Sequence, residues 1–264
     1  MDLSHIEEML TFEPEPSALS FFLVTLAISV VRYLLIAGVP YFLFYKLGWF
    51  KKYKIQMQTP APTLVRREFV WGMVSCMIMA LMLLPVYVVW QMGGTRIYAY
   101  PFEQGIWWFL ISLVVLFLVH DLWFYLTHCL LHHKLFFSRF HKIHHQSTNP
   151  TPWASLSFHP VEEILSFGFF PLMALFFPIS FAALTCFYIL MFFGNVTGHS
   201  GYELGKSMLF SKWVGSSINH NLHHTKVNYN FGLYTMIWDH MFGTFYKDLD
   251  QEYEKLERQR NHKI

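Results

Sequence analysis

Ten of the 15 histidines in this chain fall in three short segments of a sequence that is otherwise strongly apolar. The first segment, HDLWFYLTHCLLHH, contains His120, His128, His132 and His133. The second, HKIHH, contains His141, His144 and His145, and the third, HNLHH, contains His220, His223 and His224. Neutral imidazole is the commonest side-chain ligand of iron, zinc and copper, and it is costly beside a bilayer unless something pairs with it. The pattern favours a polynuclear metal site at a membrane surface.

The composition indicates a membrane protein. Charged residues make up 14% of the chain, whereas soluble domains carry about 25%. The net charge of +2 argues against a nucleic-acid partner, and none of the three cysteines has the CxxC spacing of a zinc ribbon. The acidic N-terminus and the long first apolar stretch argue against a cleavable signal peptide.

Apolar segments predict an all-α integral membrane protein with four or five transmembrane helices. A hydrocarbon core of about 30 Å needs about 20 apolar residues per helix. Segments of that kind cover about 17–45, 69–91 and 106–133. Two more, 161–177 and 179–198, are separated by Pro178, which predicts a hairpin that spans or re-enters the membrane.

Basic residues predict the orientation. The segment 46–67 carries six lysines and arginines, whereas 92–105 carries only Arg96, and positive loops favour the cytoplasm. All three histidine segments then lie on the cytoplasmic side and form a histidine-lined helical cap. We expect one membrane domain over 1–264, with a transmembrane anchor (1–105), a catalytic core (106–246) and a polar tail (247–264).

The spacing of the histidines matches helix faces. Residues four apart are neighbours on a helix, and this spacing relates His128 to His132, His141 to His145 and His220 to His224. A solvated histidine-rich face is the alternative for any single segment, but three such segments on one membrane side favour ligands. Eight nitrogens exceed the four or so ligands of one zinc ion and suit two metals, with iron, zinc and copper all open.

The order of these motifs resembles the fatty acid hydroxylase/sterol desaturase superfamily. Further elements carry the resemblance: Asp121 and Tyr125, Trp153-Ala154-Ser155, His159-Pro160 with Glu162, His199-Ser200-Gly201, Asn228-Tyr229, Trp238-Asp239 and Phe242-Gly243-Thr244. The resemblance covers about 107–246. One departure is Cys129, where many members have arginine.

The resemblance implies a non-haem di-iron centre that uses O₂ to hydroxylate a lipid C–H bond, with desaturation at the same centre as the alternative. Zinc is expected to replace iron in some purified protein, because the same nitrogens accept both. The implied metal ligands are nine histidines: His128, His132, His141, His144, His145, His199, His220, His223 and His224.

Four further residues are expected beside the ligands. Asp121, two helical turns before His128, could accept the ring N–H of a ligand histidine, or it could be purely structural. Asn195, one turn before His199, could ligate directly or through water. His159 is expected beside the ligands or at the substrate entrance, and Asp239 beside the ligands.

The chain shows neither a dinucleotide-binding fingerprint nor a cysteine set for an iron–sulfur cluster. We therefore expect a separate electron donor of cytochrome or ferredoxin type, with its reductase, and a lipid substrate such as a sterol or fatty acyl chain. The expected location is the cell inner membrane or the endoplasmic reticulum. A metal transporter or storage protein is the alternative, although transporters place their ligands near the bilayer midplane. A haem protein would need only one or two axial ligands.

Overall fold

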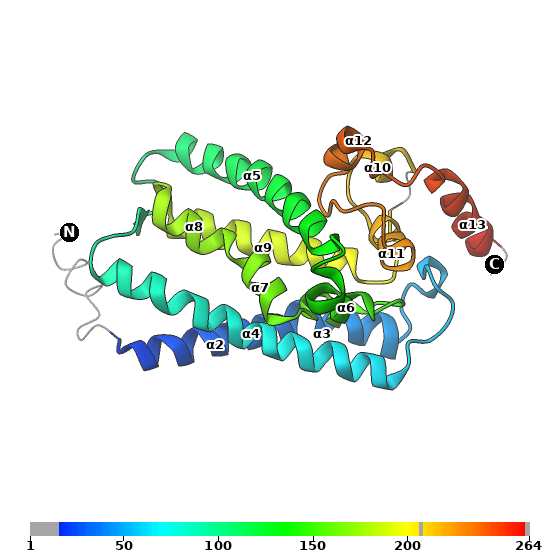
Figure 1. The fold of residues 1–264 in the computed structure, drawn as a ribbon, viewed down its shortest axis with the longest axis horizontal. Helices are drawn as coiled ribbons and strands as arrows, with labels where there is room; N and C mark the ends of the chain where they lie inside the picture. Colours follow the sequence, from blue (N-terminus) through cyan, green and yellow to red (C-terminus); the bar gives the residue numbers. More distant parts are fainter. Residues whose placement is uncertain (1–15, 206–207, 262–264) are drawn as a thin grey trace.

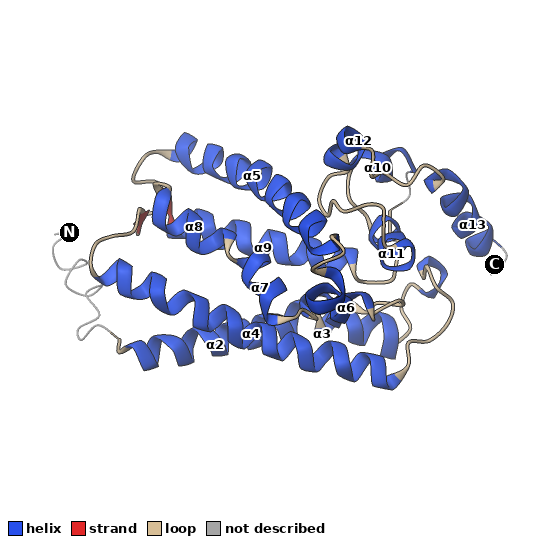
Figure 2. Ribbon diagram, viewed as in Figure 1, coloured by secondary structure: helices blue, strands red, loops and turns tan. Residues whose placement is uncertain are grey.

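The described part of the chain is mostly helical, as Figures 1 and 2 show. The computed structural model describes residues 16–205 and 208–261. Within these residues, four helical segments are long and apolar enough to cross a membrane: Ala18–Lys46, Pro62–Gln91, Ile106–His132 and Phe181–Gly198. The prediction of a helical membrane protein with four or five spans is confirmed, and the number of candidate spans is four.

The first two spans pack along each other as a pair (Figure 1). The first comprises α2 (Ala18–Ile36), α3 (Gly38–Tyr41) and a π-helical turn η1 (Phe42–Lys46), and the second is α4 (Pro62–Gln91), with the short turn η2 (Lys51–Tyr53) between them. Their close approach depends on Gly72, because a Cβ there would lie 2.1 Å from the hydroxyl oxygen of Tyr33. That hydroxyl donates to the carbonyl of Trp153 at 2.8 Å, which ties the pair to the histidine-bearing part of the chain.

The third and fourth spans are α5 (Ile106–His132) and α9 (Phe181–Gly198). The expected apolar helix over 161–177 is broken at Gly168 into α7 (Pro160–Phe167) and α8 (Phe169–Phe176). Each has eight residues, far fewer than the 20 or so that a span needs. A Cβ at position 168 would lie 2.6 Å from the carbonyl oxygen of Ile164, so the glycine permits the close turn between the two helices.

The predicted break at Pro178 is confirmed. There the strand β2 (Ile179–Ser180) pairs in parallel with β1 (Ile97–Tyr98), and the Ser180 hydroxyl caps α9 by accepting from the amide of Ala183. This short pairing could not be predicted from the sequence, because two residues cannot show the alternation that marks a strand.

The remaining short elements gather at one end of the long helices (Figure 1). They are η3 (Phe137–His141), α6 (Lys142–His145), η4 (Pro152–Leu156), α10 (Met208–Trp213), α11 (Ser217–Lys226), α12 (Ile237–Phe242) and α13 (Leu249–Asn261).

The C-terminal segment, expected to be a polar tail over 247–264, is helical up to Asn261, where the described residues end. It forms α13, whose Leu249, Tyr253 and Leu256 are buried against Ile218 and Leu222 of α11. These three residues recur at intervals of four and three, which places them on one helix face. The many charged residues on the other faces hid this apolar face in the sequence.

Candidate metal centre

Four parts of the chain meet at this end of the long helices: the end of α5, the η3–α6 turn, the end of α9 and the helix α11. The end of α5 carries His128 and His132, and the η3–α6 turn carries His141, His144 and His145. His199 directly follows α9, and α11 carries His220, His223 and His224. Eight of these nine side chains are buried, and His132 is half-buried. All nine histidines expected as ligands are therefore brought together.

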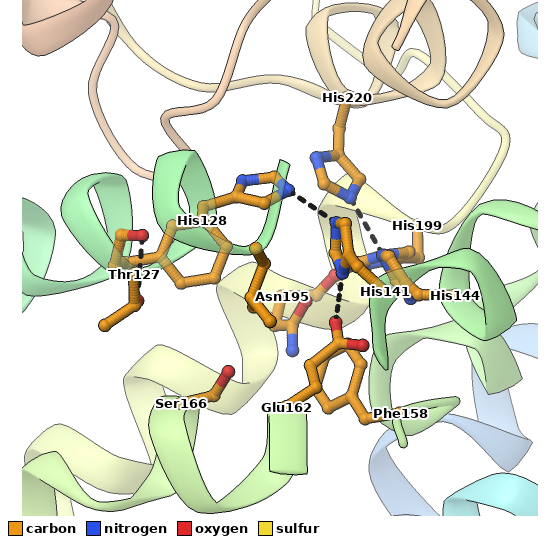
Figure 3. Close-up of a pocket in the computed structure, with 12 residues that line it drawn as sticks. Thr127, His128, His141, His144, Phe158, Glu162, Ser166, Asn195, His199 and His220 are labelled. Carbon is orange, nitrogen blue, oxygen red and sulfur yellow. Dashed lines mark hydrogen bonds and ion pairs between the residues drawn. The ribbon is translucent and has the colours of Figure 1, made fainter. Parts of the chain in front are cut away.

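The nine histidines form two groups, each with ligand nitrogens within 4.8 Å of one another. The five-histidine group consists of His128, His132, His141, His145 and His223. The four-histidine group consists of His144, His199, His220 and His224. Figure 3 shows members of both groups with their imidazoles turned toward one another.

In the five-histidine group, the Nε2 atom of His145 lies 3.0 Å from that of His132, 3.1 Å from that of His141 and 3.0 Å from that of His223. One proton can satisfy only one of these contacts. In the four-histidine group, the Nε2 atom of His199 lies 2.8 Å from that of His220 and 3.2 Å from that of His144. Two nitrogens each about 2.1 Å from a metal, at a right angle, are about 3.0 Å apart, so both groups fit a bound cation.

Hydrogen bonds on the outer ring nitrogens set the tautomers. His128 Nδ1 donates to the Phe231 carbonyl at 2.7 Å, His223 Nδ1 to the Tyr229 carbonyl at 2.7 Å, and His199 Nδ1 to the Asn195 carbonyl at 2.8 Å. A carbonyl oxygen can only accept, so each of these Nδ1 atoms carries the ring proton. Each Nε2 atom therefore directs a bare lone pair into its group, which is the form that binds a metal.

A buried carboxylate supports a fourth ring. Glu162 Oε1, in the first turn of α7, lies 2.8 Å from His141 Nδ1, and both side chains are 2% exposed or less (Figure 3). Burial, and then the neighbouring Glu163, raise the pKa of Glu162 well above its usual range. A cation among the histidines would favour the ionised form of this carboxyl, because opposite charges stabilise each other.

Burial keeps the histidines neutral. Desolvation lowers the pKa of His141, His144, His145, His220, His223 and His224 well below the usual value, and repulsion among the rings lowers it further. Burial likewise lowers the pKa of His199, to about 4, partly opposed by its bond to the Asn195 carbonyl. Neutral imidazole is the ligand form, so the site is ready for metal at neutral pH.

Among the described residues, the Asp121 carboxylate makes no contact with a ligand histidine, although the sequence suggests one. Its carboxylate accepts from the amide and hydroxyl of Thr235, at 3.2 and 2.5 Å, and from the Trp238 indole at 2.9 Å. These bonds fasten α5 to the loop before α12 and satisfy both carboxylate oxygens. The structural alternative stated for Asp121 is the one that the structure supports.

The side chains of Asp239 and His159 also accept hydrogen bonds from backbone amides. Asp239 accepts from the amides of Phe231 and Gly232, both at 2.8 Å, and so fixes the loop whose Phe231 carbonyl orients His128. His159 Nδ1 accepts from the Val161 amide at 3.1 Å, which caps the start of α7. Neither residue bonds to a ligand histidine among the residues described.

Asn195 contributes through its backbone carbonyl, which orients His199. Its side-chain amide nitrogen donates to the Ser155 carbonyl at 2.8 Å. Its Oδ1 atom is buried without a hydrogen-bond partner in the described part of the chain and lines the cavity beside the histidines.

Sequence reasoning missed Glu162 as the partner of His141, although the motif containing it was recognised. Its position in the first turn of the helix that begins at Pro160 was the available signal. The carbonyls of Phe231 and Tyr229 were also missed. Backbone acceptors leave no trace in residue type, so no sequence signal could have found them.

Four apolar helices and two buried groups of imidazoles define a helical protein with candidate membrane spans and a histidine-rich site that could hold metal ions. Comparison with known families agrees: the family model described as fatty acid hydroxylase matches residues 113–244, half of the 264-residue chain. The chain belongs to this family.

Several curated proteins are similar to the chain. A Delta(7)-sterol 5(6)-desaturase of Leptosphaeria maculans is 27% identical over 242 residues, covering 90% of this chain and 65% of that protein. Lathosterol oxidase of Homo sapiens is 30% identical over 144 residues, covering 54% of this chain and 48% of that protein. The chain thus spans just under two thirds of the first relative and about half of the second. No solved structure matches it significantly.

Proposed function

We propose that the chain is an O₂-dependent membrane oxidoreductase that oxidises a C–H bond of a lipid at a di-iron centre. The observation that carries the proposal is the pair of buried histidine groups, with five and four inward-facing nitrogens. Two groups suit two metal ions, and an all-nitrogen donor set suits iron. The metal transporter proposed as an alternative is disfavoured, because the histidines lie at the ends of the spans and not at their middles.

The relatives favour a sterol substrate and desaturation. Their names describe sterol desaturases and a lathosterol oxidase, whereas hydroxylation, with desaturation as the alternative, is the expectation from motifs that do not separate the two. We therefore propose removal of two hydrogens from adjacent sterol carbons, with hydroxylation as the second candidate because the matching family model carries that name.

When bound, iron would supply the activation of O₂ that makes an unreactive C–H bond breakable. His128, His132, His141, His145 and His223 would hold one ion, and His144, His199, His220 and His224 the other. Phe124, Leu131 and Phe158 line the adjoining cavity and exclude water from it. Glu162, which shares that cavity, holds the orientation and proton of His141.

The proposed reaction also needs a source of electrons. Two electrons per turnover would come from a separate cytochrome or ferredoxin with its reductase. The basic segment 46–67 supports a cytoplasmic position for the short helices and the histidines, where such a donor would dock.

The test is a reconstitution. Purified, iron-loaded protein would be mixed with lathosterol, O₂, NADPH, a small cytochrome and its reductase, and the lipid analysed by mass spectrometry. Loss of two mass units supports desaturation, and a gain of 16 supports hydroxylation. An unchanged lipid in protein that carries its full metal, with sterol and fatty acyl substrates alike, would contradict the proposal.

A further inference from the structure

The short helices α10 and α12 expose large apolar side chains. Five side chains, here called the α10–α12 patch, are each between 48% and 69% exposed: Leu209, Trp213, Ile237, Met241 and Phe242. The two helices are joined to each other. The amide of Met236 donates to the carbonyl of Trp213 at 2.9 Å, and the Nε2 atom of His240 donates to the carbonyl of Lys212 at 2.8 Å. The patch therefore belongs to one connected pair of helices.

Polar side chains of the same two helices are engaged with the protein. Ser211 and Asp239 are 1% exposed or less, and Lys212 pairs with Asp250 of α13 at 2.8 Å. On a surface that faces water, charged and hydroxyl side chains are the ones that are mostly exposed. Here the apolar side chains are outermost, and a group of exposed apolar side chains commonly marks a protein or membrane contact.

The length of α5 gives the level at which this helix leaves the hydrocarbon. It comprises 27 residues, or about 40 Å at a rise of about 1.5 Å per residue, whereas a hydrocarbon core of about 30 Å takes about 20 residues. Trp107, at the start of α5, is 74% exposed, and tryptophan is enriched at membrane interfaces. Counted from Trp107, the hydrocarbon ends near Leu126, and the ligands His128 and His132 lie beyond it.

The helix α12 is fastened to α5 at this level. The indole of Trp238 donates to Asp121 at 2.9 Å, and the ring of Phe242 stacks on that of Tyr125, with centroids 5.5 Å apart and planes at 17°. Figure 1 shows α10 and α12 to one side of the histidine-bearing end of α5. At the same level α5 exposes Leu126, so the patch lies beside a part of the span that needs lipid around it.

We propose that the α10–α12 patch inserts into the membrane interface beside α5, in the leaflet on the side of the histidines. Large aromatic and aliphatic side chains that face lipid, with polar side chains turned the other way, are typical of helices that lie in the interface. A soluble partner at this level would displace the lipid that covers Leu126, whereas the bilayer covers both surfaces. The contact depends on the candidate spans and is independent of the reaction proposed above.

The contact also ties the metal centre to the lipid surface. Asp239 of α12 accepts from the amides of Phe231 and Gly232, and the carbonyl of Phe231 orients His128. The loop that orients a ligand histidine is thus held by the helix that meets the lipid. Insertion of the patch therefore keeps the histidines next to the membrane, where a lipid is at hand.

The test is photo-labelling of the wild-type full chain in phosphatidylcholine vesicles. Part of the lipid carries a diazirine close to the headgroup end of one acyl chain, and illumination attaches this lipid to the side chains that it touches. Peptide mass spectrometry is expected to find lipid adducts within 208–213 and 237–242, as well as at the ends of the spans. The exposed charged face of α13, with Glu254 and Arg258, should carry none. No variant is needed, so the result does not depend on the folding of a mutant.

A second experiment examines single positions. The photoreactive amino acid p-benzoylphenylalanine is placed at Met241 in the patch, at Leu118 on the exposed side of α5, or at Glu254 of α13. A phospholipid adduct is expected at positions 241 and 118, and it should be lost at position 254. The three proteins differ only in the labelled position, so the last two are matched controls for the first.

Two results would overturn the proposal. If the ends of the spans are labelled and both 208–213 and 237–242 are not, the patch does not touch lipid. If position 241 gives a product of twice the mass of the chain in place of a phospholipid adduct, the patch is covered by a second copy of the chain. Both readouts are independent of lipid oxidation, so they leave the proposed function untouched.

Discussion

The two histidine groups differ in how their rings are held. In the five-histidine group, three rings are oriented through Nδ1, by the carbonyls of Phe231 and Tyr229 and by Glu162. In the four-histidine group only His199 is held in this way, by the carbonyl of Asn195. The other three, His144, His220 and His224, have buried Nδ1 atoms without hydrogen-bond partners in the described residues. The protein orients three of the five rings in the first group and one of the four in the second, so a bound metal ion would contribute more to the order of the second group.

The largest expected effect comes from removing a ligand in either group. His145→Ala should abolish oxidation, with a loss well beyond the 10–100-fold that changes around a ligand typically cause, because its Nε2 atom contacts three other ligand nitrogens. His220→Ala should do the same for the other group. Each variant should also lose about one metal per chain, measured by elemental analysis.

His133→Ala is the matched control for these variants, since His133 is exposed and belongs to neither group. It should keep both its metals and its activity. A fully active His145→Ala protein would show that the five-histidine group is not a metal site.

Removing an orienting group should have a smaller effect. Glu162→Leu leaves the His141 ring in place but removes the acceptor of its Nδ1 proton, so metal affinity in the five-histidine group should fall about 10–100-fold. Glu162→Gln should recover part of it, because the amide oxygen can still accept. A competition titration with a chelator measures this affinity, with Glu254→Leu, at an exposed position, as the control. An unchanged metal affinity in Glu162→Leu would show that this carboxyl does not support the five-histidine group.

The order in which the two histidine groups lose their metal tests the difference between them. Because three of its four rings lack an orienting partner, the four-histidine group should release its metal first under a chelator, on the order of 10 times faster. The time course of metal content should show two phases in the wild type. Glu162→Leu should speed up the slow phase alone, and a single phase in the wild type would mean that the two groups are equally held.

Lowering the pH should decrease the stability of the folded chain gradually. The pKa of His199 is lowered to about 4 in the folded chain from an ordinary value of 6.5, so below about pH 6.5 the unfolded chain takes up a proton that the folded chain does not. Stability is therefore fully present above about pH 6.5 and declines toward pH 4, by at most about 1.4 kcal/mol per pH unit for each such histidine. Thermal unfolding of the metal-free chain between pH 7 and 4.5 measures this, and a flat profile would contradict the burial of the neutral rings.

The sequence was most informative where residue type and spacing carry the physics. Hydropathy identified the four spans, and four-residue spacing related six of the nine histidines that the structure brings together, whereas His144, His199 and His223 were named through the family resemblance. It failed where a feature depends on contacts that residue type and spacing do not show. Gly168 breaks an apolar run because of a local close approach, and α13 is helical because three spaced apolar residues find α11. Asp121 bonds to Thr235 and Trp238, more than a hundred residues away, which no pattern near His128 could indicate.

The measurement that tests the central claim most directly is the iron content of the purified, catalytically active chain, determined together with the protein concentration. The account predicts two irons per chain, one for each group of histidines, and a fall to about one in both His145→Ala and His220→Ala. One iron per active chain, or full activity without metal, would contradict it.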